Sequence, residues 1–263
     1  MRAIDGKVIV ITGASSGIGA AVARLVGEKG AWPVLAARRL DKLRGVAAES
    51  GSNALVVAAD VTRREEVKRI VDTALGQFGH IDVWINNAGR GITRKIADLT
   101  DEDFDEMMLV NTKSALYGMQ AILPHFKERK RGHIINVASV LGRIPFASIR
   151  SAYNAAKHAL MSLTANLRVD LRADFPDIHV SSVLPGVVAT DFGLSARHGG
   201  PDSRQLPFPQ PVEEVAQVIA DLIEYPRAEA YTRPIYKQQV AAYYGAEDLA
   251  AIESRPPFVT TKP

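Results

Sequence analysis

The sequence has no cysteine among its 263 residues, which excludes disulfide bonds and thiolate metal ligands. Long apolar runs are also missing, since no stretch approaches the ~18–20 apolar residues of a membrane-spanning helix. The first apolar stretch, residues 7–11, is too short and too rich in β-branched residues for the core of a signal peptide. We therefore expect no membrane span, and the lack of cysteine fits a cytoplasmic protein.

The sequence also lacks a large excess of charge of either sign. The 32 lysines and arginines nearly balance the 29 aspartates and glutamates, which gives a net charge of +3. The densest basic run, residues 127–131 (KERKR), precedes a predicted strand and indicates a solvated helix end rather than a nucleic-acid-binding patch. The six histidines are scattered without the spacing of metal ligands. We therefore expect neither nucleic-acid binding nor a metal site.

The sequence does contain a regular alternation of strands and helices. Apolar, β-branched segments predict strands at residues 7–11, 32–37, 54–59, 81–85, 132–138 and 178–184. Amphipathic segments predict helices at residues 63–78, 101–126, 151–173 and 212–225. This alternation predicts a single α/β domain, a doubly wound parallel sheet with helices on both faces. Residues 191–211, rich in glycine, proline and serine, predict a loop that we assign to substrate binding.

A glycine-rich turn follows the first strand. Gly13, Gly17 and Gly19 bracket it, and a helix follows. A helix that begins at such a turn directs unsatisfied N–H groups and the positive end of its dipole toward a bound phosphate. The turn therefore indicates a dinucleotide site, the alternative being a helix cap without a ligand. It also fits the nucleophile elbow of α/β-hydrolases, but only twelve residues precede Gly13, too few to supply half of an oxyanion hole.

The end of the second strand indicates which dinucleotide is bound. A site for NAD places a carboxylate there, whereas this strand is followed by Arg38 and Arg39. Two guanidinium groups suit the 2′-phosphate of NADP through forked, charge-assisted hydrogen bonds. The nearest carboxylate, Asp41, is predicted to be a helix N-cap. We expect NADP(H), with NAD(H) not excluded; the alternative is an arginine pair that lies in solvent.

Tyr153 and Lys157 are four residues apart on a predicted helix, and hence on one face. An ammonium group beside a tyrosine favours the phenolate and lowers the pKa of the phenol toward the range useful for proton transfer. Ser139 ends the preceding strand, where its hydroxyl could hydrogen-bond to a substrate carbonyl. The alternative is that the pair, like most tyrosines and lysines at this spacing, consists of solvated helix neighbours. Asn111 is unfavourable inside a helix and predicts either solvent exposure or a specific bond.

Several of these segments together resemble the short-chain dehydrogenase/reductase family, in its compact single-domain branch. They are TGASSGIG at 12–19, NNAG at 86–89, Asn111, Ser139, YNAAK at 153–157 and PGVVAT at 185–190, and the resemblance spans about residues 5–235. It implies a seven-stranded Rossmann sheet and a tetrad in which Tyr153 is the general acid/base. Lys157 would bond the nicotinamide ribose and lower the pKa of the tyrosine, Ser139 would orient the substrate oxygen, and Asn111 would anchor a water-linked proton path.

The resemblance also implies a set of cofactor contacts at the glycine turn and the strand ends. In it, Asp60 and Val61 line the adenine pocket and Thr190 holds the carboxamide of the nicotinamide. Because Ser16 stands where many NADP-preferring members carry a basic residue, Arg38 and Arg39 would do most of the discrimination. The full set is Gly13, Ser15, Ser16, Gly17, Ile18, Gly19, Arg38, Arg39, Asp60, Val61, Asn87, Ala88, Gly89, Tyr153, Lys157, Pro185, Gly186, Val188 and Thr190. From the residues alone, the asparagines at 86–87 are as well explained by a structural role, and Asp60 by a cap.

The candidate substrate contacts are mostly apolar. They are Leu141, Phe146, Val187 and Phe192 with Ser139 and Tyr153, and further loop residues are Val140, Ile144 and Leu194. We expect an apolar or aromatic ketone, aldehyde or secondary alcohol.

Two rival functions remain. Basic residues at 127–131, Arg143 and Arg150 would suit reduction of a 3-oxoacyl chain on an acidic carrier protein. The other rival is a regulatory protein that binds NADPH without turnover.

Self-association is expected as well. Small residues on the helix predicted at 151–173 allow close helix packing, and the family commonly pairs such helices across a two-fold axis, so we expect a homodimer or homotetramer. Residues 236–263 extend beyond the family core and could cover the active site or a neighbouring subunit.

Overall fold

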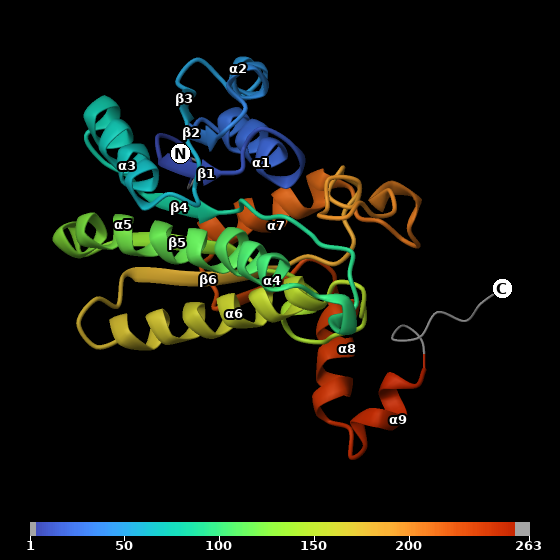
Figure 1. The fold of residues 1–263 in the computed structure, drawn as a ribbon. Coiled ribbons are helices and arrows are strands. Elements are labelled where there is room, and N and C mark those ends of the chain that lie inside the picture. The colour runs from blue at the N-terminus through green and yellow to red at the C-terminus, as the bar shows by residue number, and fades with distance from the viewer. Residues whose placement is uncertain (1–3, 256–263) are drawn as a thin grey trace.

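The computed structural model describes residues 4–255, which form one seven-stranded parallel sheet (Figure 1). The strand order β3-β2-β1-β4-β5-β6-β7 is that of a doubly wound Rossmann sheet, so the predicted fold class is confirmed. The strands are β1 Val8–Thr12, β2 Trp32–Ala37, β3 Leu55–Ala58, β4 Val83–Asn86, β5 Gly132–Val137, β6 Ile178–Leu184 and β7 Glu229–Tyr231.

Two layers of helices cover the sheet. The first comprises α1 Gly17–Glu28, α2 Leu40–Ala48 and α7 Val212–Glu224; the second comprises α3 Arg64–Phe78, α5 Ser114–Arg129 and α6 Ser151–Leu171. In β1, Ile9 and Ile11 face the first layer, whereas Val8 and Val10 face the second. Burial on both faces explains why this strand is apolar throughout. No helix within residues 4–255 is both long enough and apolar enough to cross a membrane.

The carboxyl ends of β1 and β4 lie side by side, at the point where the strand order reverses. Asn87 joins them: its backbone N–H donates to Thr12 Oγ1 (3.0 Å) and its side-chain Nδ2 donates to the Thr12 carbonyl (2.9 Å). The side chain of Asn86 accepts from Trp84 Nε1 and donates to Asn136 Oδ1. Both asparagines therefore have the structural role that was one of the two interpretations of this pair.

The helix predicted at residues 101–126 is interrupted. It consists of α4 Asp101–Met108, a π-helical turn at Leu109–Lys113 (η2), and α5. Asn111 lies in the turn, where its Nδ2 donates to the Met107 carbonyl (3.1 Å). The asparagine that is unfavourable in an α-helix thus lies in a π turn, an element that is frequent at functional sites.

Two local predictions concern β2 and the helix after it. Pro33 is the second residue of β2, and pairing with β3 begins only at Val34, so the missing N–H of the proline costs no bond to that neighbour. The prediction that Asp41 caps α2 is wrong: Arg39 occupies the cap position and Asp41 lies in the first turn. A carboxylate there still interacts favourably with the helix dipole.

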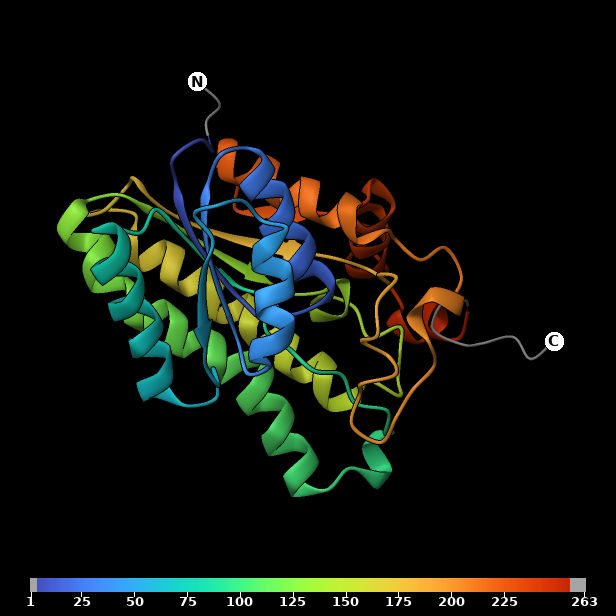
Figure 2. The ribbon, with the colours of Figure 1, turned by 90° about the horizontal axis from the view of Figure 1, so that it is seen from above.

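The C-terminal segment supplies β7, the last strand of the sheet, and two further helices, α8 Pro234–Tyr244 and α9 Leu249–Glu253. The two helices lie beyond the end of the sheet (Figure 2). The ring of Tyr236 on α8 lies against Gly186, where an added Cβ would be 2.2 Å from the tyrosine oxygen. The predicted C-terminal extension therefore covers the turn after β6. Its last residues, 256–263, lie outside the described part of the chain. Three short 3₁₀ turns complete the structure: η1 Ile96–Asp98, η3 Val140–Gly142 and η4 Ser203–Gln205.

His133 is a buried titratable group in β5. The Ser181 hydroxyl donates to the Arg227 carbonyl, so it accepts a hydrogen from His133 Nε2 at 2.8 Å. Burial, followed by the charges of His179 and Lys7, lowers the pKa of His133 to about 3. The folded protein therefore holds this imidazole neutral at any pH well above 3.

We predict that His133 makes the protein acid-sensitive. Between pH 6.5 and about 3 the unfolded chain binds a proton that the folded chain does not, so stability falls as the pH falls through this window. Urea unfolding of His133→Gln should show a loss of unfolding free energy between pH 7 and pH 5 that is about 2 kcal/mol smaller than in the wild type. The exposed neighbour offers a control, since His179→Gln should retain most of the wild-type pH dependence. Identical pH dependence in wild type and His133→Gln would contradict the prediction.

Candidate active site

The glycine turn is packed tightly against the loop that follows β4. A Cβ at Gly13 would lie 2.8 Å from Ala88 Cα, and one at Gly19 would lie 2.6 Å from Asn87 Nδ2. Gly13 also has a φ of +67°, which favours glycine. The sequence places these glycines where a side chain would push the turn away from β4.

Helix α1 begins at Gly17, at the carboxyl edge of the sheet. Its N-cap residue, Ser16, makes no side-chain hydrogen bond to the first turn, so the N–H groups of that turn are left for another acceptor. A Cβ at Gly17 would lie 3.3 Å from Thr190 Cγ2, which brings the residue predicted to hold the carboxamide next to the turn. This end of the helix fits the phosphates of a dinucleotide.

The two arginines after β2 point to different places. Arg39 Nη2 donates to Ser15 Oγ (2.9 Å) and to Ser16 Oγ (3.0 Å), so its charge lies over the glycine turn. Arg38 lies near Asp60: burial raises the pKa of Asp60, but hydrogen bonds from Thr62 and the charge of Arg38 outweigh it and hold that pKa below its ordinary value. Of the two arginines, Arg39 is thus the one whose guanidinium contacts the glycine turn.

Three of the four predicted catalytic residues meet at the carboxyl end of β5. Tyr153 and Lys157 lie on α6 and are 7% and 4% exposed, with Lys157 Nζ 5.7 Å from the centre of the Tyr153 ring. Ser139 follows β5, and its hydroxyl is hydrogen-bonded to Tyr153. Lys157 Nζ donates to the Val137 carbonyl (2.9 Å), which fixes the ammonium beside the phenol.

The pKa of Tyr153 differs in direction from the sequence-based expectation. Burial raises it to about 12, and the hydrogen bond with Ser139 and the charge of Arg150 only partly offset this. Burial also lowers the pKa of Lys157 to about 8. In the protein alone, loss of hydration thus outweighs any effect of the nearby ammonium. The phenol is therefore neutral at pH 7, the form that can donate a proton.

Asn111, the fourth predicted catalytic residue, is held by the backbone of Arg90. Its Oδ1 accepts from the Arg90 N–H (3.1 Å) and its Nδ2 donates to the Arg90 carbonyl (2.9 Å). A Cβ at Gly89 would lie 2.9 Å from Asn111 Oδ1 and 3.7 Å from Lys157 Nζ. A side chain at residue 89 would therefore crowd the amide of Asn111, beside the ammonium of Lys157.

The predicted substrate contacts divide into two groups. The ring of Phe192 lies 5.5 Å from that of Tyr153, edge to face, and Leu141 packs in the same cluster. Phe146 packs instead in the cluster under α8. Val187 is partly exposed in the turn after β6 and Leu194 is exposed, whereas two of the further loop candidates are core residues, Val140 and Ile144.

The basic residues cited for an acidic carrier protein do not form one surface. Arg143 is paired with Glu229, and Arg150 is buried. Residues 127–131 lie where α5 ends and β5 begins, at the opposite end of that strand from Ser139.

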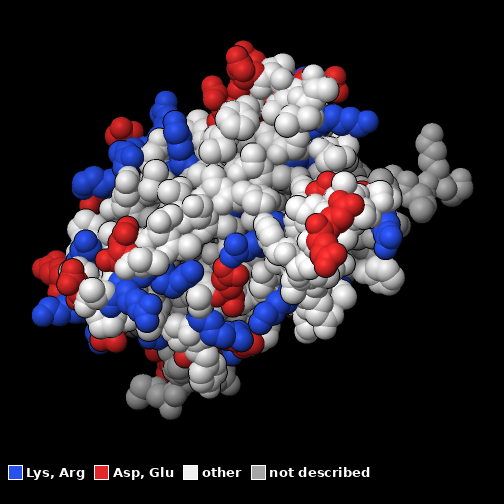
Figure 3. All heavy atoms as spheres, turned by 90° about the horizontal axis from the view of Figure 1, so that it is seen from below, with Lys and Arg blue, Asp and Glu red and all other residues white. Residues whose placement is uncertain are grey.

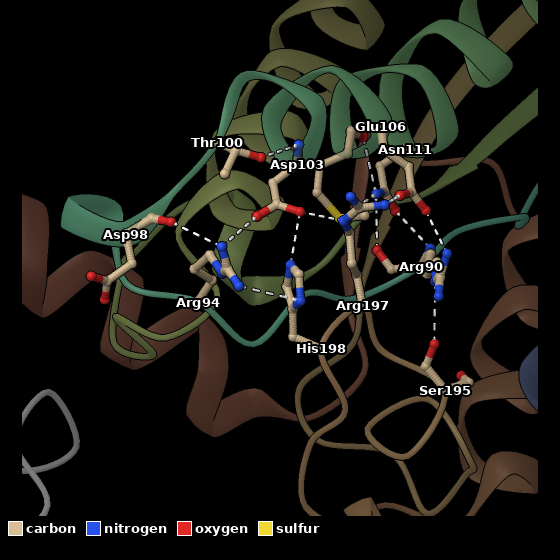
Figure 4. Close-up of polar contacts among 11 residues, drawn as sticks. Arg90, Arg94, Asp98, Thr100, Asp103, Glu106, Asn111, Ser195, Arg197 and His198 are labelled. Atoms are coloured by element: carbon tan, nitrogen blue, oxygen red, sulfur yellow. Dashed lines mark hydrogen bonds and ion pairs between the residues drawn. The ribbon is translucent and has the colours of Figure 1, made fainter.

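The loop at residues 191–211 is tied to α4 by charged groups that the sequence did not reveal (Figure 4). Asp103, whose side chain is 1% exposed, accepts from Arg197 Nε and from His198 Nε2 (2.8 Å). Glu106 accepts from Arg197 and from Arg90. Backbone bonds join the loop to the segment after β4, since Arg197 N donates to the Gly91 carbonyl (2.9 Å). The loop that carries Phe192 is therefore anchored against α4.

We predict that Asp103 holds this loop closed. Burial raises its pKa, but hydrogen bonds from His198 and Arg197 hold that pKa below the ordinary 3.8, so the anchor persists above that pH and is lost as the pH falls through the lowered value. Asp103→Asn should lower the opening free energy of the loop by about 2–3 kcal/mol and speed trypsin cleavage after Arg197 roughly 30–150-fold. Asp101→Asn, an exposed change on the same helix, is the control. Equal cleavage rates in all three proteins would contradict the prediction.

Known proteins resemble this chain in sequence and in overall fold. The sequence model described as short chain dehydrogenase matches residues 7–199. An uncharacterized oxidoreductase of Staphylococcus saprophyticus is 39% identical over 192 residues, which are 73% of this chain and 78% of that protein. A short chain dehydrogenase/reductase from Burkholderia phymatum, solved in complex with NAD, is 27% identical with a TM-score of 0.85; the match covers 100% of this chain and 99% of that one. A short chain dehydrogenase from Burkholderia cenocepacia in complex with NADP is 27% identical with a TM-score of 0.81, covering 99% and 100%.

Proposed function

Because the chain belongs to the short-chain dehydrogenase/reductase family and is an oxidoreductase of that family, we propose that it is an NADP(H)-dependent enzyme acting on a carbonyl or secondary alcohol with Tyr153 as general acid/base. The observation that carries this proposal is the buried group of Ser139, Tyr153 and Lys157 at the edge where the glycine turn lies. The bound coenzyme supplies or accepts the hydride.

The residues that would hold the dinucleotide surround the end of β1. The turn from Gly13 to Gly19 and the N-terminus of α1 would receive its phosphates, and Asp60 with Val61 would line the adenine pocket. Lys157 would bond the nicotinamide ribose beside Gly89. Thr190, next to Gly17, would hold the carboxamide.

Each catalytic side chain has a distinct task in reduction. The neutral phenol of Tyr153 donates its proton to the substrate oxygen as negative charge develops there, and the Ser139 hydroxyl donates a hydrogen bond to the same oxygen. In the oxidative direction the phenol must first lose its proton, which its raised pKa opposes. Asn111, fixed to Arg90, would anchor a water-linked path along which that proton is exchanged with solvent.

Arg39 supports a preference for NADP over NAD. Its guanidinium lies over Ser15 and Ser16, and no acid follows Ala37 in the next three residues. A 2′-phosphate at this position would accept charge-assisted hydrogen bonds, whereas a ribose hydroxyl would find no carboxylate acceptor.

A mostly apolar substrate is supported by the residues beside Tyr153. Leu141 and Phe192 belong to the cluster that contains its ring, so the wall next to the phenol is apolar. We retain a ketone, aldehyde or secondary alcohol as the reacting group.

A homodimer or homotetramer and a cytoplasmic location remain part of the proposal. Ala155 is exposed on α6 and Ala159 partly so, which would allow a second helix to approach closely. Figure 3 views the molecule from below Figure 1, the side on which α6 lies. Charges of both signs are interspersed on this face, with uncharged surface across its middle.

We predict that Tyr153→Phe lowers the rate of ketone-dependent NADPH oxidation about 10²–10⁴-fold, because the proton donor is lost. Binding of NADPH, measured by its fluorescence, should change less than about threefold, since the ring that packs on Phe192 is kept. The exposed Tyr225→Phe is the control. Wild-type protein that binds NADPH but oxidises it with no ketone, aldehyde or alcohol of a broad panel would instead favour the non-catalytic regulatory protein.

We predict that Arg39→Gln raises the KM for NADPH about 10–100-fold and leaves the KM for NADH nearly unchanged, because a charge-assisted contact to the 2′-phosphate is lost. Arg44→Gln, an exposed change on α2, is the matched control. If Arg39→Gln weakens NADPH and NADH equally, the arginine supports the turn rather than the phosphate.

A further inference from the structure

Arg150 is a buried cation for which the described part of the chain supplies no carboxylate partner. It lies at the N-cap of α6, three residues before Tyr153, and is 8% exposed. Its Nη1 donates to the Ile92 carbonyl (3.0 Å) and to Thr93 Oγ1 (3.2 Å), both neutral acceptors. Within residues 4–255 it forms no ion pair, and the side-chain hydrogen bonds of its guanidinium come from this one nitrogen.

Among the described residues, the other arginines near Tyr153 and Phe192 differ from Arg150, because they are paired with acids. Six of them lie on the loops that border the site or on the segments packed against these loops, and each forms an ion pair: Arg90, Arg94, Arg143, Arg197, Arg204 and Arg233. All six are more exposed than Arg150. A buried unpaired charge is unfavourable, so the exception needs a reason.

The guanidinium of Arg150 lies beside Phe192, the side chain that packs on the Tyr153 ring. A Cβ at Gly91 would be 3.0 Å from Arg150 Nη1 and 2.9 Å from Phe192 Cε1, so both side chains pack against the same glycine. A Cβ at Gly200 would be 3.3 Å from Nη2, which places that nitrogen under the loop at residues 191–211. Phe192 in turn contacts the ring of Tyr153. The charge of Arg150 also acts on the phenol. Burial raises the pKa of Tyr153, and the charge of Arg150 lowers it by a smaller amount.

We propose that Arg150 selects substrates that carry a carboxylate or a similar anion on an otherwise apolar body, apart from the reacting carbonyl. The inference rests on the proposed oxidoreductase function and names its substrate class. A guanidinium has five N–H donors in a planar fork that fits a carboxylate, and here Nη2 and Nε are not used by described residues. The apolar side chains of Leu141 and Phe192 would pack on the rest of the molecule.

Matched pairs of neutral and anionic ketones test this directly. The probes are phenyl-substituted oxo acids with one, two or three bonds between the ketone and the carboxylate carbon, each with its primary amide, which has the same size and no charge. In the wild type, kcat/KM for NADPH-dependent reduction of at least one acid should exceed that of its amide about tenfold or more. Arg150→Met should lower the kcat/KM of that acid about 30-fold or more, mainly through KM, and should lower that of the amide less than about threefold.

Two further variants separate recognition from structure. Arg150→Lys keeps the charge and should recover part of the preference for the acid, although it lacks the fork. Arg172→Gln removes an exposed charge at the other end of α6 and should leave the preference unchanged. If the substitution of Arg150 also changes the reactivity of Tyr153, it changes kcat/KM for the acid and for its amide by the same factor. The ratio of the two kcat/KM values is then unaffected.

Calorimetric titration of the same probes into protein saturated with NADP⁺ provides a readout without turnover. The acid should bind the wild type more tightly than the amide, and Arg150→Met should abolish the difference. Equal affinities, or equal losses for acid and amide in the variant, would overturn the inference and leave Arg150 an anchor for the segment at Ile92. A failure of every ketone to oxidise NADPH would instead overturn the proposed function, while carboxylate binding that depends on Arg150 would still stand.

Discussion

The site depends on how the ends of β1 and β4 are joined at the point where the strand order reverses. The two strands are paired with each other, and beyond the last pair the side chain of Asn87 hydrogen-bonds the backbone of Thr12. The glycine turn can then pack on Ala88, because Gly13 and Gly19 have no side chain to prevent it. One amide thus sets the position of the α1 N-terminus relative to the loop that leads to Gly89 and Asn111.

Loss of hydration is the second constraint on the site. Tyr153, Lys157 and Arg150 are all buried within one short stretch of α6 and its cap, so each loses hydration that an ordinary surface group keeps. Burial acts on the three in a consistent way: it disfavours phenolate, ammonium and guanidinium alike. A buried site of this kind responds strongly to any charge that enters it, because little solvent screens the interaction.

The sequence was sufficient for the fold and for part of the site, for identifiable reasons. Strands such as β2 and β6 were predicted at their exact bounds because apolar runs carry a strong signal, and the proximity of Tyr153 and Lys157 followed from helical spacing. The pKa of the phenol was misjudged because burial depends on tertiary packing. The anchor between Asp103 and Arg197 joins residues 94 positions apart, which no local pattern records. The cap of α2 was misplaced by two residues, since Arg39 took it without a side-chain bond.

The π turn at Leu109–Lys113 has a geometric consequence for the whole second layer. A π turn holds one residue more than the α-helix that could replace it, and each α-helical residue advances the chain by roughly 100° around the axis. The apolar stripe of α5 that carries Met119, Ile122 and Phe126 is therefore out of phase with α4. Deleting one residue would give a continuous α-helix. The amide of Asn111 could then no longer face Arg90 while the apolar stripe of α5 faces the sheet.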